Sequence, residues 1–169
     1  YAPNMAGTPQ SLYRQAAVIE ETGVGCVMIA PMLVGLPVFH ELVRDYVRVP
    51  VLAHPAFAGS LRMTPDFLLG KLYRLLGADA SIFPNYGGRF SYSKATCIQL
   101  ADNLRQEWGD LKNAFPAPAG GMQVDRVDEM IDFYGLDVML LIGGSLLVAD
   151  DITAHSRTFV ENVHAAEEG

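Results

Sequence analysis

Phe115-Pro116-Ala117-Pro118-Ala119-Gly120-Gly121 is an apolar stretch that ends in a glycine pair, and Leu140-Leu141-Ile142-Gly143-Gly144-Ser145 has the same form. A pattern typical of an amphipathic helix follows each stretch. Glycine lets the main chain approach a ligand closely, and a helix N-terminus adds partial positive charge. One Gly-Gly pair is more often an ordinary turn. Two pairs in successive strand–turn–helix units favour a site in which backbone N–H groups of Gly120, Gly121, Gly143 and Gly144 bind a phosphate.

Composition limits the class of protein. The chain has 169 residues, half of them apolar, which is enough for about one domain with one core. A net charge of −7 argues against a nucleic acid or an anionic membrane as partner, because either would need a basic face. Cys26 and Cys97 are too isolated for a zinc motif and are expected to be reduced thiols of a cytoplasmic protein. A phosphorylated small molecule would therefore be held by local dipoles or by a metal.

One pattern recurs along the chain: a short apolar strand, a turn rich in Gly, Pro or Asn, and an amphipathic helix. The expected strands are residues 1–5, 26–30, 51–54 and 80–83, a stretch that ends at Gly120, and residues 138–142. The expected helices follow Thr8, Pro37 and Thr64 as N-terminal signals, and then span about 93–107, 124–134 and 153–166. The repeated unit is that of a β/α protein.

The architecture follows from the strands and from the position of the glycine pairs. Nearly uniform apolar strands are buried on both faces, which predicts a parallel sheet. An open nucleotide-binding sheet usually carries GxGxxG after its first strand, and none follows Met5 here. In a barrel, phosphate commonly lies at the loops after the last two strands. We therefore predict an α/β fold that is a partial TIM (β/α)₈ barrel and contains units three to eight.

Four segments carry a resemblance to a known family: Tyr1-Ala2-Pro3-Asn4-Met5-Ala6-Gly7-Thr8, Gly77-Ala78-Asp79, Pro118-Ala119-Gly120-Gly121 and Ile142-Gly143-Gly144-Ser145. In order and spacing they resemble the catalytic domain of the ribulose-bisphosphate carboxylase (RuBisCO) large chain. The stretches 52–56, 83–89 and 133–144 are most similar to its RuBisCO-like branch, which does not fix carbon dioxide. The resemblance implies that residues 1–169 are the C-terminal part of the barrel domain. The N-terminal domain and the first two barrel strands would then lie upstream of Tyr1.

The resemblance also implies roles for single residues. The four glycines match positions that bind a substrate phosphate, Asn4 matches an asparagine beside the metal, and His54 matches a histidine near the metal and the reacting carbons. From the residues alone, Asn4 is equally well a turn residue. The alternative for His54 is a core histidine, but its place at the carboxyl end of a strand favours a functional role. The implied cofactor is Mg²⁺, whose ligands are expected upstream of Tyr1 and not in this chain. The implied assembly is a homodimer.

Departures from the family pattern narrow the chemistry. Pro55 and Ile82 stand where the carboxylases bind a second phosphate, and neither side chain binds an anion. Ala119 replaces a serine before the first glycine pair. The loop after the fourth expected strand offers Arg89, which is either a contact for a substrate carboxylate or an exposed loop arginine. Carboxylation of ribulose bisphosphate is therefore not expected.

The resemblance implies that the remaining site takes a singly phosphorylated ketone, which reacts through a metal-stabilised enediolate. Decarboxylation of a 3-oxo sugar-acid phosphate is the favoured reaction. The alternative is an enolase or isomerase of a methionine-salvage diketo or methylthio sugar phosphate. It needs an apolar pocket, which the sequence does not locate. A further alternative is a non-catalytic fragment or a split chain, since without metal ligands this polypeptide alone is expected to be inactive.

Overall fold

The computed structural model describes residues 2–90 and 92–167, and within them a parallel sheet follows the order of the chain, β1-β2-β3-β4-β5. The strands are β1 (Asn4–Met5), β2 (Val27–Ile29), β3 (Val51–Ala53), β4 (Ala80–Pro84) and β5 (Phe115–Ala119). One register row crosses the whole sheet, from Asn4 through Met28, Leu52 and Ala80 to Phe115. All strands therefore end at the same edge of the sheet, and the loops that follow them meet there.

Helices connect successive strands, and others follow the last strand. They are α1 (Pro9–Thr22), α2 (Pro31–Val34), α3 (Leu36–Glu41), α4 (Pro65–Phe67), α5 (Tyr73–Leu75), α6 (Lys94–Arg105), α7 (Val127–Tyr134), α8 (Gly144–Leu147) and α9 (Ile152–Glu167). Two π-helical segments, Leu42–Tyr46 and Leu68–Leu72, continue α3 and join α4 to α5, and 3₁₀ turns lie at Ala58–Ser60 and Val124–Arg126. The Thr8 hydroxyl caps α1 by accepting from the Ser11 N–H at 3.3 Å, and Ser93 caps α6 in the same way. No helix in the described ranges is long and apolar enough to cross a membrane.

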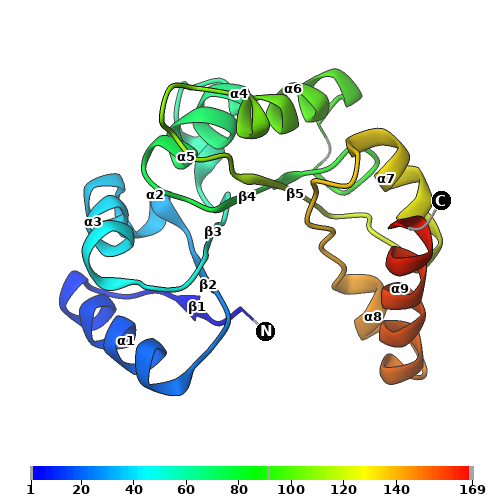
Figure 1. Cartoon of the computed structure of the whole chain (residues 1–169), viewed down its shortest axis with the longest axis horizontal. Helices are drawn as coiled ribbons and strands as arrows, with labels where there is room; N and C mark the ends of the chain where they lie inside the picture. The colour runs from blue at the N-terminus through cyan, green and yellow to red at the C-terminus, as the bar shows by residue number, and fades with distance from the viewer. Residues whose placement is uncertain (1, 91, 168–169) are drawn as a thin grey trace.

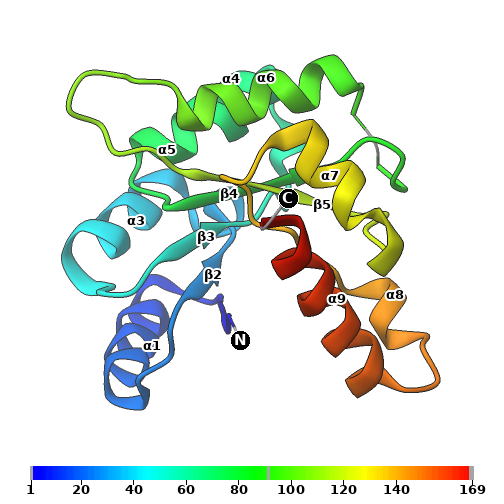
Figure 2. The same ribbon diagram turned by 45° about the vertical axis from the view of Figure 1, so that its right-hand side comes forward.

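The chain curves into an arc, in which the sheet lies on the concave side and most of the helices lie on the convex side (Figures 1 and 2). Leu52, Ala80, Ile82 and Ala117 form an apolar layer on the inner face. A larger core joins the opposite face of the sheet to the helices, and includes Leu12, Phe39, Leu69, Leu100 and Met130. Apolar layers on both faces are what a parallel barrel sheet requires. The structure thus confirms the predicted α/β class with parallel strands.

Three local predictions differ from the structure. The sixth strand, predicted at 138–142, is reduced to one bridge between Ala119 and Leu141 and a hydrogen bond of 2.9 Å from the Met139 N–H to the Pro116 carbonyl. Among the described residues this segment has a strand partner only on its β5 side, which leaves its other edge unpaired. Thr64 precedes α4 but makes no side-chain capping bond. The first strand is confined to Asn4–Met5, and the predicted start at Tyr1 lies outside the described residues.

Candidate functional site

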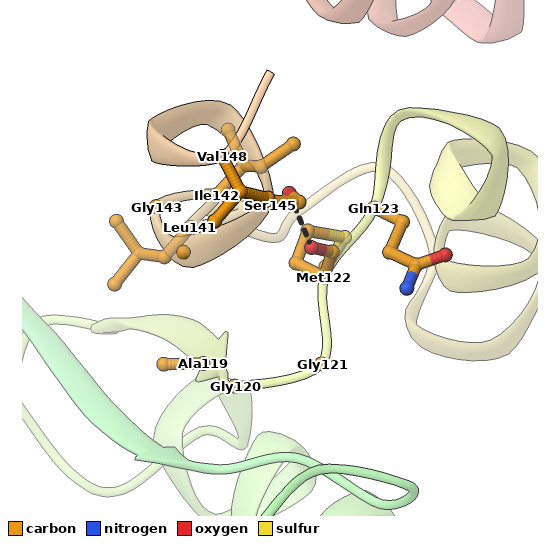
Figure 3. Close-up of a pocket in the computed structure, with 11 residues that line it drawn as sticks. Ala119, Gly120, Gly121, Met122, Gln123, Leu141, Ile142, Gly143, Ser145 and Val148 are labelled. Carbon is orange, nitrogen blue, oxygen red and sulfur yellow. Dashed lines mark hydrogen bonds between the residues drawn. The ribbon is translucent and has the colours of Figure 1, made fainter.

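The two glycine pairs lie on one cavity at the edge of the sheet where the strands end. This cavity, the diglycine cavity, has a volume of about 520 Å³ and is bounded by residues 119–123 on one side and residues 141–145 and 148 on the other (Figure 3). The Ser145 hydroxyl donates a hydrogen bond of 3.0 Å to the Met122 carbonyl and so joins the two turns. The structure thus brings together all four glycines that the sequence singles out.

The first turn is tightly packed against a neighbouring loop. Gly120 and Gly121 have φ values of +87° and +72°, in the left-handed region that favours glycine. A Cβ on Gly121 would lie 3.1 Å from the Gly88 Cα, and a Cβ on Gly88 would lie 2.9 Å from the Gly120 carbonyl oxygen. The loop after β4 therefore rests directly on the β5 turn, backbone against backbone.

The second turn is open. Neither Gly143 nor Gly144 has a positive φ, and a Cβ on either would meet nothing within 4 Å. Both residues line the diglycine cavity, so the space in front of them belongs to that cavity. At Gly144, whose backbone is helical, folding of the described chain does not itself demand glycine.

The N–H groups at the turns are available to an anion. Among the described residues, the backbone N–H groups of Gly121 and Gly143 donate no hydrogen bond. The helices that follow are weaker than the sequence suggests. A 3₁₀ turn comes first after Gly121, and α8 is a single turn of four residues. Short helices align few peptide dipoles, so the N–H groups themselves supply most of the positive potential.

A second cavity of about 310 Å³ adjoins the first and shares Ala119 and Gly120 with it. We call it the His54 cavity. His54 and Arg89 both line it, and most of the remaining lining is apolar: Pro55, Ile82, Phe83, Pro84 and Phe90. Arg89 is exposed at this cavity, and its guanidinium lies 5.2 Å from the centre of the Phe90 ring. An apolar pocket, which the sequence does not locate, is therefore present beside the glycines.

The ring of His54 is held in one tautomer. The Ala56 N–H donates to Nδ1 of His54 at 3.1 Å, so Nδ1 carries a lone pair and the proton of the neutral ring is on Nε2. Burial lowers the pKa of His54 below its reference of 6.5, which favours the neutral ring. His54 therefore offers an N–H donor, rather than a free base, through the nitrogen that the backbone does not occupy.

Asn4 lies apart from these residues. It shares the inner face of the sheet with Met28, its register partner, but it is exposed and lines a different cavity beside α1, together with Arg14 and Val18. Within residues 2–90 and 92–167, no group of three or more His, Cys, Asp or Glu side chains is placed to hold a metal ion. The described residues do not by themselves fit Mg²⁺.

Sequence reasoning missed two residues that hold the β5 turn. Ser145 bonds to Met122, as described above. Arg126 donates to the Gly121 carbonyl at 2.9 Å and forms an ion pair with Glu129. The i,i+3 spacing of Arg126 and Glu129 was a visible signal, but it is typical of any exposed helix and does not reveal the contact with Gly121.

The fold and the site together define a class: a β/α protein of the TIM-barrel type, with paired glycine turns at the carboxyl ends of its strands. Comparison with known proteins narrows this class. No protein-family model matches the chain. The chain is 51% identical to ribulose bisphosphate carboxylase-like protein 1 of Rhodopseudomonas palustris, across 96% of this chain and 45% of that protein. It is 46% identical to a 5-methylthioribulose-1-phosphate isomerase of Rhodospirillum rubrum, across 98% of this chain and 45% of that protein.

A solved structure agrees with these relatives. The crystal structure of a RuBisCO-like protein from Rhodopseudomonas palustris superimposes with a TM-score of 0.89 at 46% identity, over 97% of this chain and 44% of that one. The chain belongs to the RuBisCO-like proteins of the ribulose-bisphosphate carboxylase large-chain superfamily. It spans a little under half the length of these relatives.

Proposed function

We propose that the whole protein isomerises or enolises a singly phosphorylated methylthio sugar ketone, with the phosphate in the diglycine cavity and the rest of the substrate in the His54 cavity. One observation carries the proposal: a cavity lined by two glycine turns adjoins a largely apolar cavity that contains His54 and Arg89. A compound with one phosphate, a carbonyl and an apolar tail matches this arrangement, with the phosphate in the diglycine cavity and the carbonyl and tail in the His54 cavity.

Phosphate binding is supported by the open second turn. The N–H groups of Gly121 and Gly143 have no partner among the described residues, and a phosphate oxygen would satisfy them. The empty space before Gly143 and Gly144 would admit that oxygen, whereas side chains at these positions would fill it. Local N–H groups are needed because the chain as a whole is acidic, with a net charge of −7.

The reacting carbonyl would lie near His54. A neutral imidazole that donates from Nε2 stabilises the negative charge that develops on a carbonyl oxygen during enolisation, without needing to lose a proton. The apolar lining from Pro55, Ile82 and Phe83 keeps that charge away from water, which strengthens the interaction. The same lining suits a methylthio group.

The two candidate reactions, decarboxylation and isomerisation, differ in the part of the substrate that lies away from the phosphate. It is a carboxylate in the first case and a methylthio group in the second. The sequence favours decarboxylation of a 3-oxo sugar-acid phosphate, and one observation still supports it: Arg89 lines the His54 cavity and could pair with a carboxylate. The apolar pocket and the 46% identity to an enzyme named 5-methylthioribulose-1-phosphate isomerase favour the methylthio substrate. We therefore place isomerisation first and decarboxylation second.

Magnesium and a homodimer stay predictions for the whole protein. The described residues supply no metal-ligand cluster, so Mg²⁺ would have to be held by residues other than these. No step above depends on the metal.

The experiment is an assay of the whole protein with 5-methylthioribulose 1-phosphate in D₂O, followed by proton NMR. Loss of a carbon-bound proton signal and appearance of an isomer support the proposal. Carbon dioxide release from 3-oxo sugar-acid phosphates, with no change in the methylthio sugar, would favour decarboxylation instead. Binding of both compounds without turnover would indicate a non-catalytic protein.

A further inference from the structure

We infer that Arg126 is a positioning residue, which locks the β5 glycine turn to the loop after β4 so that the phosphate-binding backbone and Arg89 are presented together. The inference rests on the proposed function, because it assumes that the diglycine cavity binds phosphate. It adds a residue that lies outside both cavity linings.

The first step is the contact with the turn itself. Nη1 of Arg126 donates to the Gly121 carbonyl at 2.9 Å. The Gly121–Met122 peptide is planar and trans, so fixing its carbonyl also fixes the Met122 N–H, which points the opposite way. Arg126 thus sets the rotation of a peptide unit whose two residues both line the diglycine cavity.

The second step is the contact with the loop after β4. The Arg126 guanidinium lies 5.5 Å from the centre of the Tyr86 ring, in reach of a cation–π interaction. Tyr86 is buried and opens the segment that leads to Arg89. The Gly87 and Gly88 backbone in the same segment is the surface against which Gly121 packs. One side chain therefore contacts both parts of the backbone junction.

Glu129 holds Arg126 in this position. It accepts from Nε of Arg126 at 2.8 Å and from Nη2 at 3.1 Å, and it also accepts from the Tyr86 hydroxyl at 2.9 Å. The Arg126 hydrogen bond, with a smaller contribution from Tyr86, lowers the pKa of Glu129, so the carboxylate stays charged at neutral pH. Each partner of this triangle is thus fixed by the other two.

Arginine is required here by geometry rather than by charge alone. The planar guanidinium sends two N–H groups to Glu129 and a third to Gly121 at once, which a lysine ammonium cannot do with the same directions. An ordinary i,i+3 ion pair on a helix surface would have no need of the Gly121 contact. Arg126→Lys therefore keeps the charge and removes the three-way bond.

The test measures the dissociation constant of inorganic phosphate by calorimetry, together with KM, kcat and Tm, on the whole protein. The variants are Arg126→Lys, Arg126→Ala and Glu129→Gln. The matched control is Arg44→Ala, because Arg44 also makes a two-point ion pair, with Asp45, but contacts neither glycine turn.

We expect Arg126→Lys to weaken phosphate binding and raise KM about 10-fold, as for loss of one charge-assisted hydrogen bond, with kcat changed by less than about 3-fold. The control should change neither.

The outcomes separate this inference from the proposed function. If the unmodified protein binds no phosphate, the proposed function fails at its first step. If it binds phosphate and both Arg126 variants bind equally well, the positioning role is wrong. A loss of affinity that follows the loss of Tm across all three variants also overturns it, because it would then be an effect on folding. Weaker binding by Arg126→Lys at an unchanged Tm supports it.

Discussion

The two turns of the diglycine cavity have the same Gly-Gly sequence, but they differ in backbone conformation and in packing. At the β5 turn, both residues have positive φ and Gly121 packs on the backbone of Gly88. At the turn before α8, neither residue has positive φ, and a Cβ on either would have open space for 4 Å around it. The first pair is glycine because the fold needs it there. Gly144 in the second pair has no such reason within the described residues, which points to the ligand instead.

A motif of small residues can therefore reflect two different kinds of constraint. A constraint from folding shows itself as lost stability when the residue is changed. A constraint from binding shows itself as lost affinity at unchanged stability. Substitutions at the two turns therefore test the comparison directly.

The largest effect on stability is expected from Gly121→Ala. Alanine at a φ of +72° is strained, and its Cβ would press on the Gly88 Cα at 3.1 Å. We expect a loss of about 2–3 kcal/mol in the free energy of unfolding, measured by urea denaturation of the whole protein. Gly120→Ala has a similar φ but no contact, so it separates the two causes with a loss of about 1–2 kcal/mol. Unchanged stability in Gly121→Ala would remove the distinction between the turns.

Gly144→Ala should do the reverse. The position is helical and open, so alanine is expected to leave stability unchanged or raise it by about 0.5–1 kcal/mol. Its methyl group would occupy the space assigned to a phosphate oxygen, and phosphate affinity should fall about 10-fold or more, a change of about 1.4 kcal/mol. Calorimetry with inorganic phosphate gives the affinity, and urea denaturation gives the stability. Retained affinity would mean that the open turn does not face the ligand.

Ser145→Ala removes the bond that links the turns. The Ser145 hydroxyl reaches the Met122 carbonyl at 3.0 Å, and its loss should cost about 1 kcal/mol of stability. Phosphate affinity should fall by less than in Gly144→Ala, because no methyl group enters the space in front of the second turn. Ser156→Ala on the neighbouring helix α9 makes the same chemical change away from this cavity and is the control. An affinity loss as large as that of Gly144→Ala would show that the Ser145–Met122 hydrogen bond matters more for phosphate binding than the open space at Gly144.

The smallest effect on stability is expected from the titration of His54, which lines the cavity beside the β5 turn. Its folded pKa is lowered by burial, so between that value and 6.5 the unfolded chain binds a proton that the folded chain does not. Stability from this group is thus fully present above about pH 6.5 and is lost as the pH falls through the folded pKa. His54→Gln should flatten this part of the stability–pH curve. Nitrogen NMR at neutral pH should show the proton on Nε2, and a proton on Nδ1 would contradict the Ala56 contact.

Much of the fold could be predicted because it depends on local signals. Thr8 and Pro9 begin α1, and apolar runs mark the carboxyl ends of the five strands to within a residue or two. The sequence predicts the fold less well where pairing with a neighbouring strand decides whether a segment becomes a strand. The apolar segment 138–142 has a strand sequence, yet only one bridge joins it to β5, because a strand is completed by its neighbours and not by its own residues.

The order of β/α units, the family and the two candidate glycine pairs could be recognised without a structure, since each depends on residue types at short spacing. Which of these residues share a site depends on how the loops fold together. The tertiary structure joined the glycines in one cavity, placed His54 and Arg89 in the next and left Asn4 in another. It also added Arg126, whose contact with the Gly121 carbonyl is not indicated by any spacing in the sequence. Parallel strands bring distant loops together at one edge of the sheet, and the fit between those loops depends on backbone angles and packing that no short motif records.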